Sequence, residues 1–262
     1  MMNTKIEPSS IDPPERVFLG TSFLLFATSV AETMYWSRSM HGGMAMPGGW
    51  TMSMAWMKMP GQSWLGMIAS FMGMWMVMMA AMMLPSLAPR LSSYRRAIRS
   101  RDGSGLGTLT VFAGAGYFFV WAVLGAIALA LGTSLAAIEM RSPAFARSAP
   151  MATGFVLLLA GCLQLTPWKA RQLDRCRVAP ACVQPLDTSA RNAWKQGIRL
   201  GVHCGLCCLS FTMILLVTGV MNLAVMAVLA IAINMERFIR RPEIASRAAG
   251  FATIAAAILV YF

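Results

Sequence analysis

Residues 64–85 read WLGMIASFMGMWMVMMAAMMLP and contain no charged side chain, so as a helix they are long enough to cross the hydrocarbon core of a bilayer. The rest of the chain has the same character: 57% of its 262 residues are hydrophobic, 12% are charged, and the mean hydropathy is +0.61. The apolar stretches of roughly spanning length lie at 17–36, 64–88, 107–138, 151–167, 200–220, 223–238 and 245–262. We therefore expect an all-α fold, a polytopic transmembrane helical bundle of about seven spans.

About seven spans and their connections use up the length of the chain. A nucleotide-binding or soluble catalytic domain has no room, which excludes ATP-driven pumping by this chain alone. We expect residues 1–16, which are polar and rich in Pro, to be a disordered cytoplasmic leader. Residues 17–262 should form one transmembrane helical domain with a Met-rich outer loop at 37–63. The first span lacks the cleavage pattern of a signal peptide, so we expect it to be retained.

The basic residues indicate the orientation. If the N-terminus is cytoplasmic, 18 of the 22 Lys and Arg residues fall in inner segments. The outer segments hold only Arg38, Lys58, Arg141 and Arg147. Because cytoplasmic segments carry an excess of Lys and Arg, the net charge of +12 reports topology rather than nucleic-acid binding. We expect a multi-pass protein of the inner membrane with its N-terminus in the cytoplasm, with the lipid bilayer as a partner and no nucleic acid.

The outer loop concentrates thioether groups. Gly and Pro residues between them let the chain fold around one ion. Thioether sulfur with one imidazole selects Cu(I) or silver over Zn, Mg or Ca, and it survives an oxidising compartment, whereas all six Cys fall toward the inner side. We expect Cu(I) to bind here, with contact between Met and the membrane interface as the alternative. The candidate ligands are His41, Met40, Met44, Met46, Met52, Met54, Met57 and Met59.

The span at 64–88 carries methionines on two faces. At about 100° per residue, one stripe contains Met72, Met76, Met79 and Met83, and a second, nearly opposite, contains Met67, Met74 and Met78. Two opposite faces cannot line one pathway. We therefore expect the first stripe to be a sulfur ladder for an ion and the other to pack or to contact lipid, with packing of both as the alternative. Pro85 should kink or end this helix.

A cluster of soft ligands opens the span at 200–220. His203, Cys204, Cys207 and Cys208 share one sector of a helix, which can supply two or three ligands to one metal ion. A further ligand must come from another helix. Folding the chain about residue 220 gives the candidates at this depth as Asn234 and Glu236, with Cys162 toward the same side. The alternatives are plain packing of the Cys, and pairing of Glu236 with the arginines that follow it.

Four other residues are candidates for a role in function, in a turn or in helix packing. Glu32 is an acidic residue near membrane depth, which is a functional candidate unless it is solvated. Asn222 is a neutral ligand or a turn former. Gly201 and Gly205 form a small-xxx-small pattern that permits close approach of another helix.

Three stretches together resemble a known family. They are WMVMMAAMMLP at 75–85, GVHCGLCC at 201–208, and GVMNL at 219–223 leading to Glu236. This combination resembles the bacterial family of predicted metal-binding integral membrane proteins, a domain of unknown function, over essentially all spans. The resemblance implies a bacterial inner-membrane protein with metal at Cys204, Cys207 and Cys208. It also implies importance for the methionines of the second span and for Met221, Asn222 and Glu236.

Three functions are compatible with the sequence. The first is handling of a soft metal, for which we expect Cu(I), in transport, delivery or homeostasis, with a donor or acceptor protein as partner. The second is a metal-dependent membrane oxidoreductase; against it, His41 and His203 lie on opposite sides and cannot ligate one haem, and no nucleotide site is evident. The third is a scaffold or assembly subunit that packs against a second membrane subunit.

Overall fold

The computed structural model describes residues 13–39, 43–47, 49–58, 61–99, 105–177, 189–239 and 241–261. Within these ranges the chain forms nine α-helices, one 3-10 helix and one antiparallel hairpin. In chain order they are α1 (Pro13–Ser39), β1 (Gly43–Ala45), β2 (Thr51–Ser53), η1 (Met54–Trp56), α2 (Trp64–Arg99), α3 (Leu106–Arg141), α4 (Pro143–Gln164), α5 (Pro167–Arg177), α6 (Ala190–Cys207), α7 (Leu209–Thr218), α8 (Leu223–Phe238) and α9 (Pro242–Tyr261). The predicted all-α fold is confirmed.

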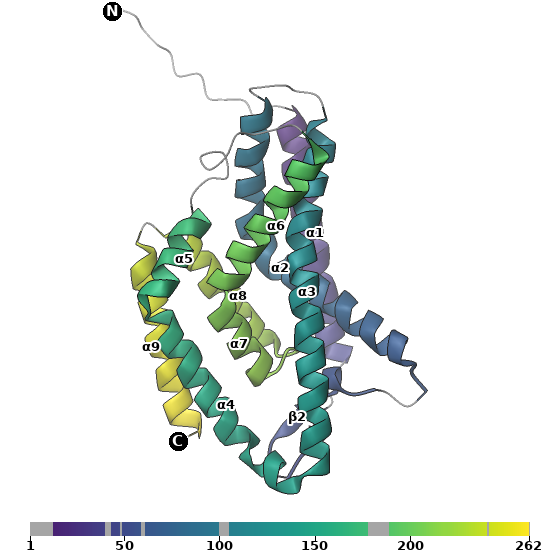
Figure 1. Cartoon of the computed structure of the whole chain (residues 1–262), viewed down its shortest axis with the longest axis vertical. Coiled ribbons are helices and arrows are strands. Elements are labelled where there is room, and N and C mark those ends of the chain that lie inside the picture. Colours follow the sequence, from purple (N-terminus) through teal and green to yellow (C-terminus); the bar gives the residue numbers. More distant parts are fainter. Residues whose placement is uncertain are drawn as a thin grey trace, which may run out of the picture.

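Two groups of helices flank a central pair (Figure 1). In one group α1 packs on α2, α2 on α3, and α3 on α6; in the other α4 packs on α9, with α5 beside them. The central pair is α7 and α8. α7 packs against α4, while α8 contacts α2, α5 and α9, so the end of α8 brings residues from both groups together.

The described helices differ in how well their length and composition suit a membrane span. In the described ranges four helices, α1 to α4, are long and apolar enough to cross a membrane. α6 and α7 reach that length only as a pair, and they meet at a bend of 63°. α8 has 16 residues. By length and composition the described chain therefore offers four spans, or five if the bent pair is one, and the expected seven are not confirmed.

α2 is longer than the sequence predicts. It continues through Pro85 and Pro89 to Arg99, so of the two expected effects of Pro85, a kink or an end of the helix, the end is excluded. The first turns of α2 run obliquely to the rest (Figure 1). Each proline removes a backbone hydrogen bond, but Met83 and Leu87 are buried on either side of Pro85. Packing against neighbouring helices therefore holds α2 together where the local sequence alone would stop it.

Glycines let α6 lie directly against α3. A methyl group added at Gly197 would lie 2.1 Å from the carbonyl oxygen of Ala113, and one at Gly201 would lie 2.9 Å from that of Tyr117. The close approach expected at Gly201 is confirmed, while Gly205 faces a leucine side chain of α3 at 3.1 Å. Small residues commonly bring membrane helices this close. This contact fixes α6, the helix that carries Cys204 and Cys207.

Replacing Gly197 by Ala should destabilise the fold, because the added carbon would lie 2.1 Å from a backbone oxygen. We expect the free energy of unfolding in detergent to fall by about 1–3 kcal/mol, the usual cost of overpacking, with a lower melting temperature. Gly114→Ala in α3 is the matched control, since nothing lies within 4 Å of the methyl group added there. Equal melting temperatures for the two variants would contradict this contact.

Candidate metal centre

The helix that carries the cysteines breaks at Cys208. α6 ends at Cys207, α7 begins at Leu209, and the two helices meet at 63°. The side chain of Lys169, from α5, donates a hydrogen bond of 2.6 Å to the carbonyl oxygen of Cys207. A carbonyl at a helix end needs such a partner where water is excluded. Because of the break, the cysteines do not share one straight helical face.

Lys169 is held in turn by a buried carboxylate. Its Nζ lies 2.9 Å from an oxygen of Glu236, near the end of α8, and both side chains are 2% exposed. The other oxygen of Glu236 accepts a hydrogen bond from the amide of Gln164, whose own oxygen accepts one from Ser210. Among the described residues, Lys169 rather than a following arginine is the ion-pair partner of Glu236. A buried ion pair needs this additional hydrogen bonding.

The next residue along α8, Arg237, points toward two cysteines. One of its amino groups donates to Sγ of Cys204 at 2.9 Å and to Sγ of Cys208 at 3.1 Å, and the other donates to the hydroxyl of Ser86. Arg237 is 8% exposed. Its Nε is buried with no hydrogen-bond partner in the part of the chain that the structure describes. A guanidinium in this position favours the thiolate form of both cysteines.

Cys204 also contacts side chains of α2 and α3. Its Sγ lies 3.8 Å from Sδ of Met83 and 3.0 Å from the hydroxyl of Tyr117. Two thiols, of Cys204 and Cys208, thus lie together with one thioether, all buried within the protein. Thiolate and thioether sulfur are soft ligands, and a purely sulfur set selects Cu(I) over harder ions. We call these three residues the Cys204–Cys208–Met83 site.

The predicted ligands do not assemble as one site. The sequence predicts that His203, Cys204, Cys207 and Cys208 give two or three ligands to one ion, whereas over the described ranges no group of three or more His, Cys, Asp or Glu side chains is arranged to hold a metal ion. The physical reason is that the thiols have different neighbours: Cys204 and Cys208 contact Arg237, and Cys207 packs against α5. Cys204 also lies near a thioether.

Cys207 turns toward α5. It lies in a buried cluster with Leu173 and Cys176. Cys176 donates a hydrogen bond to the carbonyl oxygen of His203 at 3.1 Å. The neighbouring Cys207 lowers the pKa of the Cys176 thiol from its ordinary value, although burial opposes this effect. The imidazole Nδ1 of His203 is buried and has no hydrogen-bond partner among the described residues.

Both methionine stripes of α2 face the protein interior. In the first stripe Met79 and Met83 are buried, while Met72 and Met76 are partly buried and pack against the same core. The second stripe, Met67, Met74 and Met78, is buried as well, so it packs in the core and does not face lipid. Of the first stripe, Met83 is the residue whose sulfur meets a cysteine.

The outer loop folds onto the ends of two helices. β1 and β2 pair with Met44 opposite Met52, and Met46 and Met52 are buried against alanines of α3 and α4. These two methionines therefore pack as a small core. Met54 and Met57 are half-buried and Met44 is 39% exposed. Met40, His41 and Met59 lie outside the described residues, so copper binding by this loop stays a prediction.

The remaining predicted positions are dispersed. Glu32 is exposed on α1, and Cys162 is exposed on α4. Met221 uses its carbonyl oxygen to accept a hydrogen bond of 3.0 Å from a serine of α1. Asn222 caps α8, since its side chain accepts from two backbone amides of that helix. Asn234 donates to a backbone carbonyl of its own helix at 2.7 Å and toward α2 at 3.4 Å.

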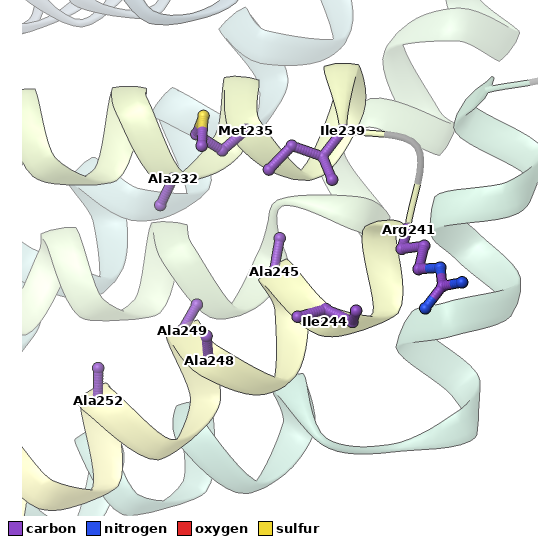
Figure 2. Close-up of a pocket in the computed structure, with 9 residues that line it drawn as sticks. All are labelled: Ala232, Met235, Ile239, Arg241, Ile244, Ala245, Ala248, Ala249 and Ala252. Atoms are coloured by element: carbon purple, nitrogen blue, oxygen red, sulfur yellow. The ribbon is translucent and has the colours of Figure 1, made fainter.

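A groove of about 730 Å³ lies between α8 and α9 (Figure 2). Alanine and isoleucine side chains form most of its lining, with Met235 and Arg241 at its edge. It contains neither Cys nor His among its lining residues. The groove is therefore not the metal centre.

Three residues around the cysteines are missing from the predicted site. Lys169 and Arg237 count in the sequence only as inner basic residues, and Tyr117 as an ordinary residue of an apolar span. The available signal was a pair of adjacent charges, Glu236 and Arg237, inside an otherwise apolar helix. Charged residues in such helices mark functional positions by default.

One comparison with known proteins identifies a family. A family model described as "PpoB2: Copper chaperone" matches residues 72–260, a range that includes Met83, the cysteines of α6 and Arg237. No curated protein and no solved structure matches the chain. The metal-related family expected from the sequence is thus confirmed in that general form, and the function is related to copper. The chain belongs to the PpoB2 family of copper chaperones.

Proposed function

We propose that this protein is an integral membrane copper chaperone, which holds one Cu(I) ion at the Cys204–Cys208–Met83 site and delivers it to a partner. The observation that carries the proposal is that both thiols contact one buried guanidinium while a thioether lies beside them. Cu(I) bound by two thiolates has a net charge of −1, and Arg237 balances it. Charge balance is what a buried ionic site requires.

The residues around the proposed site can orient its sulfur ligands. Lys169 and Glu236 hold the helix break that positions the two thiols, and Tyr117 contacts Cys204 from α3. Such outer contacts orient metal ligands and tune their affinity. A site of three soft donors binds Cu(I) with high selectivity and leaves one position from which a partner's sulfur can take the ion.

The surface supports a membrane location, which we propose to be the bacterial inner membrane. Large apolar side chains are exposed on several helices, among them Phe23 of α1, Val111 and Leu131 of α3, Phe155 of α4 and Leu259 of α9, each more than 60% exposed. A soluble monomer rarely exposes so much apolar surface. In a bilayer this apolar surface would contact lipid tails, and the backbone N–H and C=O groups are hydrogen-bonded within the helices.

Removing both thiols should abolish copper binding. We expect the protein purified in detergent under anaerobic, reducing conditions to carry about one Cu(I) per chain, and the Cys204→Ser/Cys208→Ser double variant to carry almost none, because serine is a hard and neutral donor. Elemental analysis measures the copper. The matched control is Cys162→Ser, which removes an exposed thiol from α4. The same copper content in the double variant and the control would refute this site.

Removing the charge of Arg237 should weaken binding without removing a ligand. Hydrogen bonds to a charged group contribute about 1.5–3 kcal/mol, so we expect Arg237→Gln to raise the Kd for Cu(I) roughly ten- to hundredfold. Arg237→Lys should retain part of the affinity. Competition with a chromophoric Cu(I) chelator measures the Kd. Arg247→Gln, which removes an exposed arginine of α9, is the control; an unchanged Kd for Arg237→Gln would show that this charge does not serve the site.

Replacing Met83 by Leu should remove one sulfur ligand and keep the packing. We expect X-ray absorption at the copper edge to show three sulfur neighbours in the parent protein and two in Met83→Leu. Met78→Leu is the control, because Met78 is equally buried but lies about 140° away around the same helix. A sulfur count that does not change in Met83→Leu would exclude this thioether as a ligand.

A further inference from the structure

A second pair of thiols lies next to the Cys204–Cys208–Met83 site. Cys176 of α5 lies in one buried cluster with Cys207, Cys207 directly precedes Cys208 in the chain, and Cys208 and Cys204 contact the same amino group of Arg237. The four thiols therefore form a continuous series from α5, across the break between α6 and α7, to the thioether of Met83. The geometry points to a transfer site: we propose that Cys176 and Cys207 are the two-thiol port through which Cu(I) enters and leaves. The inference rests on the proposed function.

The pair has the chemistry of a transient site. Two sulfur donors satisfy Cu(I), which accepts low coordination numbers, and both side chains are 1% exposed. The pair lacks the thioether and the direct guanidinium contacts that distinguish the Cys204–Cys208–Met83 site. We therefore expect copper to stay at the Cys204–Cys208–Met83 site at equilibrium and to bind Cys176 and Cys207 only transiently.

Arginines surround this end of the series. Arg175 of α5 and Arg199 of α6 are exposed and act electrostatically on His203, whose carbonyl oxygen accepts from Cys176. Arg90 of α2 acts on both His203 and Cys176. A positive rim attracts anions and raises their rate of encounter. The matching donor is a small anionic complex of Cu(I) with thiolates, slim enough to insert one sulfur between α5 and α6.

Transfer along the series is a sequence of ligand exchanges. At each step a Cu–S bond to the next cysteine forms, and the bond to the rear sulfur breaks. The proton of the incoming thiol passes to the sulfur that leaves, so charge and protons balance. Copper remains Cu(I) throughout, and no oxidant or reductant is consumed. Cys207 and Cys208 are adjacent in the chain, which puts the exchange at the helix break.

The rate of loading tests the port. The apo protein in detergent is mixed anaerobically with the Cu(I)–glutathione complex, and copper uptake is followed by stopped-flow absorption of the Cu(I)–thiolate band. We expect Cys176→Ser and Cys176→Ala to load roughly tenfold or more slowly, because copper loses its first two-sulfur position. Both should reach the copper content and Kd of the parent protein. Cys162→Ser is the control, and melting temperatures confirm that the variants are folded.

The outcomes separate the two proposals. Loading of both Cys176 variants at the parent rate would overturn the port and leave the proposed function intact. Loss of copper at equilibrium in these variants would also overturn it, because the pair would then belong to the holding site. Full copper content in the Cys204→Ser/Cys208→Ser variant would instead overturn the proposed function.

The role of the arginines can be tested by changing the charge of the Cu(I) complex that loads the protein. We expect Arg175→Gln/Arg199→Gln to slow loading from anionic Cu(I)–glutathione by several-fold to about tenfold, as for electrostatic steering, and the effect to shrink at high salt. Loading from the cationic Cu(I)–acetonitrile complex should not slow. Equal slowing with both donors would show that these arginines do not select an anionic donor.

Discussion

A guanidinium group stays charged inside a protein only where acceptors surround it. Arg237 is 8% exposed, and its acceptors are two thiol sulfurs and one hydroxyl. A protonated thiol is a weak acceptor, whereas a thiolate is a strong one. The thiolate, which is the form of cysteine that binds soft metals, is thus also the form of Cys204 and Cys208 that best satisfies Arg237. This interaction links the fold to the proposed function, because α8 and α6 meet through it.

The other polar contacts keep that interaction in place. Glu236 and Arg237 are neighbours in sequence but act on different targets: Glu236 binds Lys169, which supports the broken end of α6, and Arg237 faces the thiols. Glycines press α6 against α3, which allows Tyr117 to reach Cys204. Each contact constrains one helix, and together they define where the sulfurs lie. The proposed copper ligands thus come from α2, from α6 and from the junction of α6 and α7.

The apolar stretches predicted most helices and the all-α fold, because spanning length and lack of charge are strong local signals. The seven expected spans are not confirmed, since α8 is short and the α6–α7 pair bends by 63°. The cluster around Cys204 was recognised from its spacing, but the division of its thiols between Arg237 and α5 was not, because contacts between helices have no local signature. In the outer loop, Met46 and Met52 pack in a small core, a role that its Gly-rich sequence conceals.

The sequence by itself determined that the chain is helical and apolar, that its thiols and thioethers are concentrated in separate segments, and that a soft metal suits them. Periodicity and composition are local properties, so they are readable without the fold. Only the tertiary structure decided which sulfurs meet. Cys204, Met83 and Arg237 are far apart in sequence, and their side chains come together from α6, α2 and α8. No spacing rule encodes contacts between helices, since these depend on breaks, on close approach at glycines and on buried charges that must find partners.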